Sequence, residues 1–292
     1  MEKNICFFNH FHNGDLFNSR PFVKEIMSKV PARSYLYAHG QSHMILHDLE
    51  MTHIPIMQLS QIPPQVKMAE SEDTYFINTW IGAYFEPDGE CTLRFSHGMY
   101  KKVYALMNEH MGTNLKLGPI EDYWPTVDYS KYDTNKVNHF LSLYPKEKTY
   151  VLVSNGPCNS NQCSYNDDMK ELIIDLAERN KDKIFLATHK FQTVKDNIIF
   201  TDNITQTQVS DLNEISYLST FCKAIIGRSS GPYSFSITKE NVNDANKSYF
   251  CFGGKATDCF QHDMKMKCKF KFHKFETVPA LHKDLINFVE AL

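Results

Sequence analysis

The sequence predicts an α/β fold built from two Rossmann-like halves that face a cleft. Short apolar runs of strand length alternate with stretches of helical apolar spacing from Ile5 to about Ile120. A polar, aromatic segment without periodicity, 121–130, interrupts this pattern, and the alternation starts again at Thr149. Strands that alternate with helices form parallel sheets with right-handed crossovers. Two such series in one chain therefore predict two domains.

We place the domains at 1–145 and 146–292. In the first, the expected strands are 5–8, 34–38, 54–59 and 75–81, and the expected helices are 21–30, 100–111 and 134–143. Pro21 suits a first helical turn, where the missing N–H leaves no bond unmade. In the second, the expected strands are 149–154, 183–188, 197–200 and 222–227, and the expected helices are 167–180 and 211–220. Whether the last helix, 281–292, packs back on the first domain is left open.

Composition indicates a globular protein without bulk affinity for nucleic acid. The 292 residues are 42% hydrophobic and 22% charged, and the net charge is −3. A negatively charged chain lacks the general attraction to a phosphate backbone. The eight cysteines form no C-x-x-C pair, which favours reduced thiols and a cytoplasmic protein. No signal peptide or run of about 20 apolar residues is apparent, and contact with the inner face of a membrane is left open.

The loop after the first strand holds the candidate catalytic residues, Asp15 and His12. It reads His10-Phe11-His12-Asn13-Gly14-Asp15. In α/β sheets, ligands bind outside the carboxyl ends of the strands, and Asp15 is an acid at such an end. Gly14 supplies backbone freedom there. Only one of His10 and His12 is expected to face the cleft, and His12 lies closer to Asp15.

A second loop, 226–235, follows an apolar strand and suits a diphosphate. Backbone N–H groups at a helix start, hydroxyl side chains and an arginine are typical phosphate ligands. The alternative is an ordinary helix cap, where serine and glycine are common. The candidate phosphate-binding residues of this loop are Arg228, Ser229, Ser230, Gly231 and Ser234.

Two further strand ends offer groups to the same ligand. Asn155 and Gly156 follow the strand 149–154, where a plain polar turn is an equally good interpretation. Lys190 follows the strand 183–188 and could reach a phosphate. A solvated lysine is the favoured alternative for Lys190.

No metal site or cofactor is expected. His39, His43 and His47 recur every four residues, but Gly40 lies among them and the chain has no H-E-x-x-H pattern. The chain also lacks Asp-x-Asp, a motif that binds a diphosphate through a metal ion.

The stretch 264–273 alternates apolar and basic residues. As one strand it would place Lys265, Lys267, Lys269 and Lys271 on the same face. Lysines that protect an edge strand from aggregation are the favoured interpretation. The alternative is a basic strip that contacts anionic lipid or an anionic glycan.

Several motifs resemble the heptosyltransferase-type glycosyltransferases, which have the two-domain GT-B fold. Gly14-Asp15, Pro21 and Pro31-Ala32 have the spacing of that family's Gly-Asp, its early helix proline and its entry into the second strand. The loop 225–235 lies where the family has its donor-phosphate loop, Gly-x-Asp-(Ser/Thr)-Gly-x-x-His. The segment 281–292 is similar to the family's C-terminal helix.

The resemblance implies an enzyme that moves a sugar from a nucleotide-sugar donor to a hydroxyl of a glycan or glycolipid acceptor. Asp15 corresponds to the family's general base. The first domain would bind the acceptor, through Asn13, Gly14 and Arg20. The second domain would bind the nucleotide-sugar, which is a substrate and not a cofactor. The transfer would invert the anomeric carbon without a metal ion.

Two features keep other interpretations open. Ser229 and Ser234 stand where the family has aspartate and histidine, which argues against an ADP-heptose donor. A non-catalytic protein of the same fold that binds a nucleotide or a sugar phosphate is the main alternative. A dinucleotide-dependent oxidoreductase is disfavoured, because neither strand–helix turn carries G-x-G-x-x-G.

Overall fold

The chain divides into two compact units, Met1–Val127 and Asp128–Leu292. The computed structural model describes residues 2–40, 43–84, 92–144, 148–157, 169–205, 210–229 and 231–292. The division lies before helix α3 (Asn135–Leu143), whereas the sequence pattern predicts it at 145/146. The contacts of α3 explain the difference. Tyr217 donates to Asn138 Oδ1 at 2.9 Å, and the rings of Phe140 and Tyr150 lie 5.9 Å apart, so α3 belongs to the second unit.

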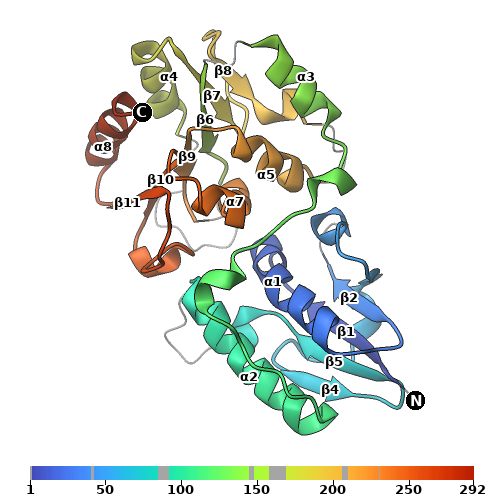
Figure 1. Cartoon of the computed structure of the whole chain (residues 1–292). Coiled ribbons are helices and arrows are strands. Elements are labelled where there is room, and N and C mark those ends of the chain that lie inside the picture. The colour runs from blue at the N-terminus through green and yellow to red at the C-terminus, as the bar shows by residue number, and fades with distance from the viewer. Residues whose placement is uncertain are drawn as a thin grey trace. The chain divides into compact units, whose positions relative to one another are not determined.

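The first unit is built on a five-stranded sheet of order β3-β2-β1-β5-β4. Neighbouring strands are parallel, except that β4 runs antiparallel to β5. Helices α1 and α2 lie side by side (Figure 1), and Phe22 stacks on Tyr100 with ring centroids 3.9 Å apart. The elements are β1 (Asn4–Asn9), α1 (Asn13–Lys29), β2 (Tyr35–His39), β3 (Thr52–Pro55), β4 (Met68–Glu70), β5 (Thr74–Asn78) and α2 (Leu93–Met111), with short 3₁₀ turns η1 (His43–Leu46), η2 (Ile56–Leu59), η3 (Ile81–Tyr84) and η4 (Ile120–Tyr123).

Helix α1 begins earlier than the sequence predicts. It starts at Asn13, so Pro21 lies inside the helix and not in its first turn. Leu16 and Phe17 are fully buried. Burial of these side chains outweighs the low helix propensity of the Asn-Gly-Asp start. Asp15 therefore stands in the first turn of a helix and not in a loop.

Helix α2 also starts before the predicted position. It begins at Leu93, where the Thr92 side chain accepts a hydrogen bond from Phe95 N at 3.0 Å. A capping threonine of this kind satisfies a backbone N–H that the first turn leaves without a partner. The short antiparallel strand β4 was not predicted.

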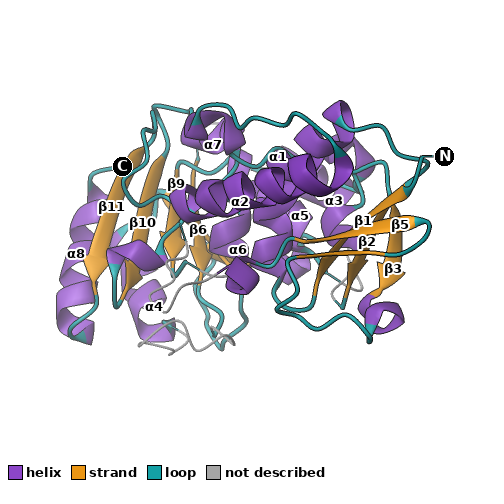
Figure 2. Cartoon of the chain, turned by 90° about the horizontal axis from the view of Figure 1, so that it is seen from below, coloured by secondary structure: helices purple, strands orange, loops and turns teal. Residues whose placement is uncertain are grey.

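The second unit is built on a six-stranded, fully parallel sheet of order β11-β10-β9-β6-β7-β8. Figure 2 shows its strands side by side, with helices on both faces. The elements are β6 (Thr149–Ser154), α4 (Lys170–Arg179), β7 (Lys183–Ala187), β8 (Ile198–Phe200), α5 (Leu212–Thr220), β9 (Ala224–Gly227), α6 (Gly231–Phe235), α7 (Lys239–Val242), β10 (Ser248–Gly253), β11 (Lys269–Lys274) and α8 (Val278–Glu290), with 3₁₀ turns η5 (Tyr129–Lys131), η6 (Thr201–Asn203) and η7 (Ala256–Asp258). The predicted alternation of strands and helices is confirmed here, and β10 is an addition.

The last helix, α8, packs in the second unit. Leu281, Leu285 and Val289 are fully buried in a core that also contains residues of α4 and of the sheet. His282 Nε2 lies 2.8 Å from the Asp175 carboxylate of α4. Figure 1 shows α4 and α8 next to each other. The spacing of four residues between these apolar side chains puts them on one face of α8.

The basic stretch 264–273 is not one strand. β11 begins only at Lys269, and it is the edge strand of the sheet. Lys265 and Lys267 precede it, and Lys267 N donates to Val242 O at 2.9 Å. The four predicted lysines are all exposed, but they do not share one face of a strand.

No helix in the described parts of the chain is both long enough and apolar enough to cross a membrane.

Candidate functional site

The first group of candidate residues lies at the carboxyl end of β1. Because β1 is parallel to both β2 and β5, the three carboxyl ends lie at one edge of the sheet, where α/β proteins bind ligands. Asn9, the last residue of β1, accepts a hydrogen bond from Phe11 N at 2.8 Å. His12 is exposed and precedes the first residue of α1.

The Asp15 carboxyl lies near the end of β1 and has a raised pKa. Asp15 is half-buried in the first turn of α1, and burial raises the pKa of its carboxyl to about 7. No hydrogen bond or ion pair joins the carboxylate to any residue that the structure describes. Burial raises the pKa of Tyr37, and the negative charge of Asp15 contributes a smaller part of that rise. The fully buried Tyr37 hydroxyl lies 3.1 Å from Ser19 Oγ. A carboxylate without a cationic partner is available to take a proton from a ligand.

Arg20 has a structural position, which corrects its assignment to an acceptor site. Its side chain is fully buried and pairs with the buried Asp48 carboxylate. It also donates to the carbonyl oxygens of Ile45, at 2.6 Å, and Thr126, at 3.1 Å. A guanidinium enclosed in this way holds α1 to two other segments and presents no surface to an acceptor.

Two residues predicted to bind phosphate hold strand ends together in the second unit. Asn155 is fully buried, donates to His189 O at 2.9 Å and accepts from His189 N at 2.8 Å. Arg228 is 1% exposed and donates to the carbonyl oxygens of Asn155 and Gly156. The buried arginine therefore orders the backbone after β6, and it acts on any ligand there only through that backbone.

Gly227, the last residue of β9, allows β9 and β6 to approach closely. A Cβ at this position would lie 2.8 Å from the Ser154 Cβ and 3.2 Å from the Tyr233 Cβ. Any larger residue would force the ends of two central strands apart. The backbone after β9 is therefore held next to the end of β6.

The loop after β9 retains groups that suit an anion. Ser229 is half-buried, and its Oγ has no hydrogen-bond partner among the described residues. Gly231 begins α6 with a positive φ of 49°, and nothing lies within 4 Å of a Cβ built there. Ser234 is buried in α6, while Ser230 lies outside the described residues. Helix α6 has only 5 residues, so its dipole is small and the local N–H groups matter more.

Lys190 is an exposed cation near the end of β7. It follows β7, and its Nζ lies 2.7 Å from the Asp202 carboxylate, with both side chains about half exposed. An exposed ion pair of this kind contributes little to stability, typically 0–1 kcal/mol. The lysine can therefore exchange Asp202 for a phosphate at small cost.

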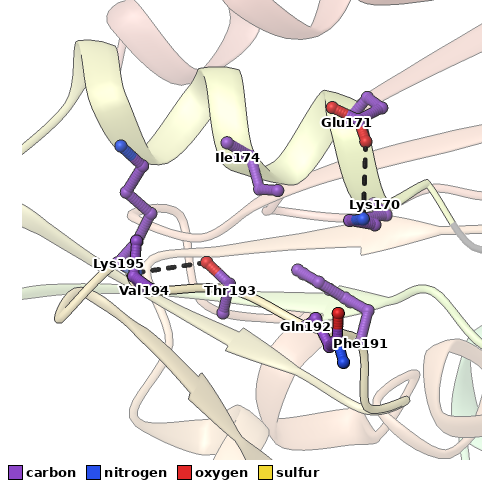
Figure 3. A pocket seen from close by; sticks show the side chains of 8 residues that line it. All are labelled: Lys170, Glu171, Ile174, Phe191, Gln192, Thr193, Val194 and Lys195. Atoms are coloured by element: carbon purple, nitrogen blue, oxygen red, sulfur yellow. Dashed lines mark hydrogen bonds and ion pairs between the residues drawn. The ribbon is translucent and has the colours of Figure 1, made fainter.

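A recess that the sequence does not reveal lies between the start of α4 and the loop from β7 to β8. Its volume is about 700 Å³. Ile174 and Phe191 extend toward its middle from the two sides (Figure 3). Lys195, at one end, pairs with Glu178 at 2.5 Å, and Lys170, at the other, lies 3.7 Å from the Glu171 carboxylate. Gln192, Thr193 and Val194 complete the lining. Its mixed charges and apolar middle suit a polar organic molecule better than a bare anion.

Within the described residues, no group of three or more histidine, cysteine, aspartate or glutamate side chains could hold a metal ion.

Comparison with solved structures shows the fold. The chain aligns with a glycosyl transferase of family 9 from Veillonella parvula over 97% of its own length and 91% of that chain, with a TM-score of 0.51 and 9% identity. It aligns with the E. coli heptosyltransferase WaaC, solved with ADP, over 99% of both chains, again with a TM-score of 0.51 and 9% identity. No model of a protein family matches the sequence. No curated protein sequence matches it either.

The two units therefore form the GT-B glycosyltransferase fold, and the expectation of this fold class is confirmed. The resemblance to heptosyltransferases that the N-terminal motifs indicate also agrees with these two solved structures. At 9% identity, this agreement concerns the fold, and the roles of individual residues have to be argued from the site itself.

Proposed function

We propose that the protein is a glycosyltransferase that moves a sugar from a nucleotide-sugar donor to a hydroxyl of a glycan or glycolipid acceptor. The observation that carries this proposal is the Asp15 carboxyl, half-buried at the carboxyl end of β1 with its pKa raised to about 7. A base with this pKa is half ionised near neutral pH and accepts a proton efficiently. The fold supports the proposal, because the family 9 protein and WaaC, which are similar in fold, are sugar transferases.

The proposed reaction is a single displacement. The acceptor hydroxyl loses its proton to Asp15 as its oxygen attacks the anomeric carbon. The bond from that carbon to the donor phosphate breaks, and its electron pair leaves with the nucleoside diphosphate. Attack opposite to the leaving group inverts the anomeric carbon.

The second unit would bind the donor. The leaving diphosphate needs compensation of its charge, and Lys190 is a cation that can supply it. The unpartnered Ser229 hydroxyl and the N–H groups around Gly231 add hydrogen bonds. Arg228 and Asn155 would position the backbone of Gly156 for the same ligand. In this proposal the nucleotide-sugar is a substrate, and no further cofactor takes part.

A melting screen against UDP, GDP, ADP, CMP and dTDP, with and without Mg²⁺, tests the donor site. One nucleotide at a hundred times its dissociation constant should stabilise the protein by about 2.7 kcal/mol, which is visible as a higher melting temperature. Lys190→Ala should reduce the shift, whereas Lys181→Ala, at an exposed lysine of the same unit, should not. A folded protein that none of the five nucleotides stabilises would contradict the proposed donor.

The exposed lysines before and within β11 support a second part of the proposal, contact with an anionic membrane surface that carries a lipid-linked acceptor. Lys265, Lys267 and Lys269 are exposed, and each basic residue near an anionic surface contributes about 1 kcal/mol. Replacing all three with glutamine should strongly reduce sedimentation with phosphatidylglycerol vesicles. The matched control replaces the exposed Lys101, Lys116 and Lys131, which lowers the net charge equally. Equal loss of binding in both variants would contradict a specific basic surface.

A further inference from the structure

The ends of β1 and β5 carry the same local turn. Asn9 Oδ1 accepts a hydrogen bond from Phe11 N at 2.8 Å, and Asn78 Oδ1 accepts one from Trp80 N at 2.9 Å. An asparagine that bonds to the backbone two residues further on forms an Asx turn, which fixes the direction of the chain. The two strands are parallel, with Phe8 opposite Asn78. The two Asx turns therefore place Phe11 and Trp80 next to each other.

These two aromatic side chains contact each other. The Phe11 and Trp80 rings are tilted by 38°, with centroids 4.1 Å apart, and both residues are half-buried. Gly82 makes room for the indole, because a Cβ there would lie 2.1 Å from Trp80 Cζ2. Backbone and glycine together hold Trp80 in one place. The result is a rigid aromatic surface that is partly open to solvent.

Polar atoms without partners occur in the segment that carries Phe11, and the centroids of the His10 and Phe11 rings lie 6.3 Å apart. Asn78 Nδ2 donates to Pro64 O and Val66 O, both at 2.7 Å. The equivalent atom of Asn9, Nδ2, belongs to a fully buried side chain, yet it has no hydrogen-bond partner among the described residues. His10 Nε2 and Asn13 Oδ1 are also buried atoms without a hydrogen-bond partner in the part of the chain that the structure describes. Buried polar atoms without partners are rare in native proteins and call for an explanation.

Their hydrogen-bonding character is mixed. Asn9 Nδ2 is a donor and Asn13 Oδ1 is an acceptor. His10 contacts the Ile62 backbone, and burial lowers its pKa, so its ring is neutral near pH 7. With the other nitrogen directed to Ile62, Nε2 is an acceptor. A ligand rich in hydroxyl groups satisfies this combination, because each hydroxyl both donates and accepts.

We propose that Phe11 and Trp80, together with Asn9, His10 and Asn13, form a binding site for one pyranose ring. The C–H groups on one face of the sugar lie against the aromatic pair, and its hydroxyls bond to the three unpartnered polar atoms. Asp15 follows Asn13 by two residues and belongs to the same turn of chain. The identification of this ring as the acceptor rests on the proposed function, whereas the binding site itself does not.

The test measures sugar binding and not turnover. Saturation-transfer NMR is recorded with the methyl glycosides of glucose, galactose, mannose and N-acetylglucosamine, using the full chain. At least one of them should receive saturation, strongest at the protons of one ring face. Trp80→Phe keeps an aromatic face and should retain binding within about threefold, whereas Trp80→Leu should weaken it by about tenfold. Asn13→Ala should weaken binding as well.

Controls separate this inference from the proposed function. Nucleotide-induced melting shifts should be the same in Trp80→Leu and in the unaltered protein, because the donor residues belong to the other unit. Phe221→Ala, which removes an exposed aromatic ring of the second unit, should leave glycoside binding unchanged. Absence of saturation for all four glycosides, or equal binding by the Leu and Phe variants, would overturn the sugar site even if nucleotides bind. Sugar binding that depends on Trp80, in a protein that no nucleotide stabilises, would support the site and remove the transferase proposal.

Discussion

Asp15→Asn is expected to lower turnover about 10²–10⁴-fold, the range that general base catalysis contributes. Asparagine keeps the size and polarity of the side chain but cannot take the proton. The melting shift with the nucleotide that binds best should be unchanged, since the donor residues lie in the second unit. The measurement is the initial rate of nucleoside diphosphate release, and the melting screen is run in parallel. Asp122→Asn, at an exposed aspartate of the same unit, is the control and should keep full activity.

The pH dependence of the unaltered protein follows from the same carboxyl. Activity should rise with pH as Asp15 ionises, with a midpoint at or slightly below about 7, because the first turn of α1 favours the charged form. Between the ordinary pKa of aspartate and about 7, the folded state retains a proton that the unfolded state has lost. The free energy of unfolding therefore falls as pH rises through this window.

In the Asp15→Asn variant the free energy of unfolding should not fall with pH in this way, because asparagine does not titrate. The variant should be more stable than the unaltered protein at pH 8, by up to about 4 kcal/mol, since one pKa unit corresponds to about 1.4 kcal/mol. At pH 4 the two proteins should be nearly equal. Urea unfolding at both pH values measures the difference. A variant that keeps normal turnover would exclude Asp15 as the base, and a protein without turnover before or after the change would favour the non-catalytic binding alternative.

Arg20→Met is expected to destabilise the first unit by about 3–5 kcal/mol, the usual effect of removing one partner of a buried ion pair. The Asp48 carboxylate stays enclosed after the change, and the Ile45 and Thr126 carbonyl oxygens lose their donor. Urea unfolding followed by far-UV circular dichroism measures the loss. The corresponding change at an exposed position, Arg94→Met, should alter stability by less than about 0.5 kcal/mol.

A double variant makes this prediction specific. Arg20→Met with Asp48→Leu removes both buried charges and should recover a large part of the lost stability, because apolar side chains often replace a buried pair without penalty. If Arg20→Met unfolds at the same urea concentration as the unaltered protein, the guanidinium is not the structural centre we describe. An acceptor-binding role would then have to be considered again.

The strands and helices of the second unit could be predicted because their signals are local. The apolar run of β6 was predicted at its observed bounds, and α5 was predicted within one residue at its start. Apolar spacing of this kind reports which face of an element is buried, whatever its neighbours are. The early starts of α1 and α2 and the short β4 could not be predicted in this way. They depend on burial against the sheet, which their own residues do not report.

Some residues of the candidate site could also be predicted from the sequence, and others could not. Asp15 could be found as an acid just after the first strand, because parallel sheets place ligands at that edge. Arg20, Asn155 and Arg228 have the chemistry of ligand-binding residues, yet the structure buries all three and engages them with protein groups. Trp80 and Asn9 could not be predicted as binding residues from the sequence. Their proposed role depends on the pairing of β1 and β5, two strands far apart in the sequence.

The order of residues along the chain is enough to predict two α/β halves and an acid that follows the first strand. Both follow from the order and period of residues along the chain. Which polar side chains remain available to a ligand follows from the folded structure and not from the order of residues. Availability depends on what other segments bring to each side chain, since a buried guanidinium or amide must find partners wherever the fold supplies them. The same requirement identifies Asn9, His10 and Asn13, whose buried polar atoms find none among the described residues.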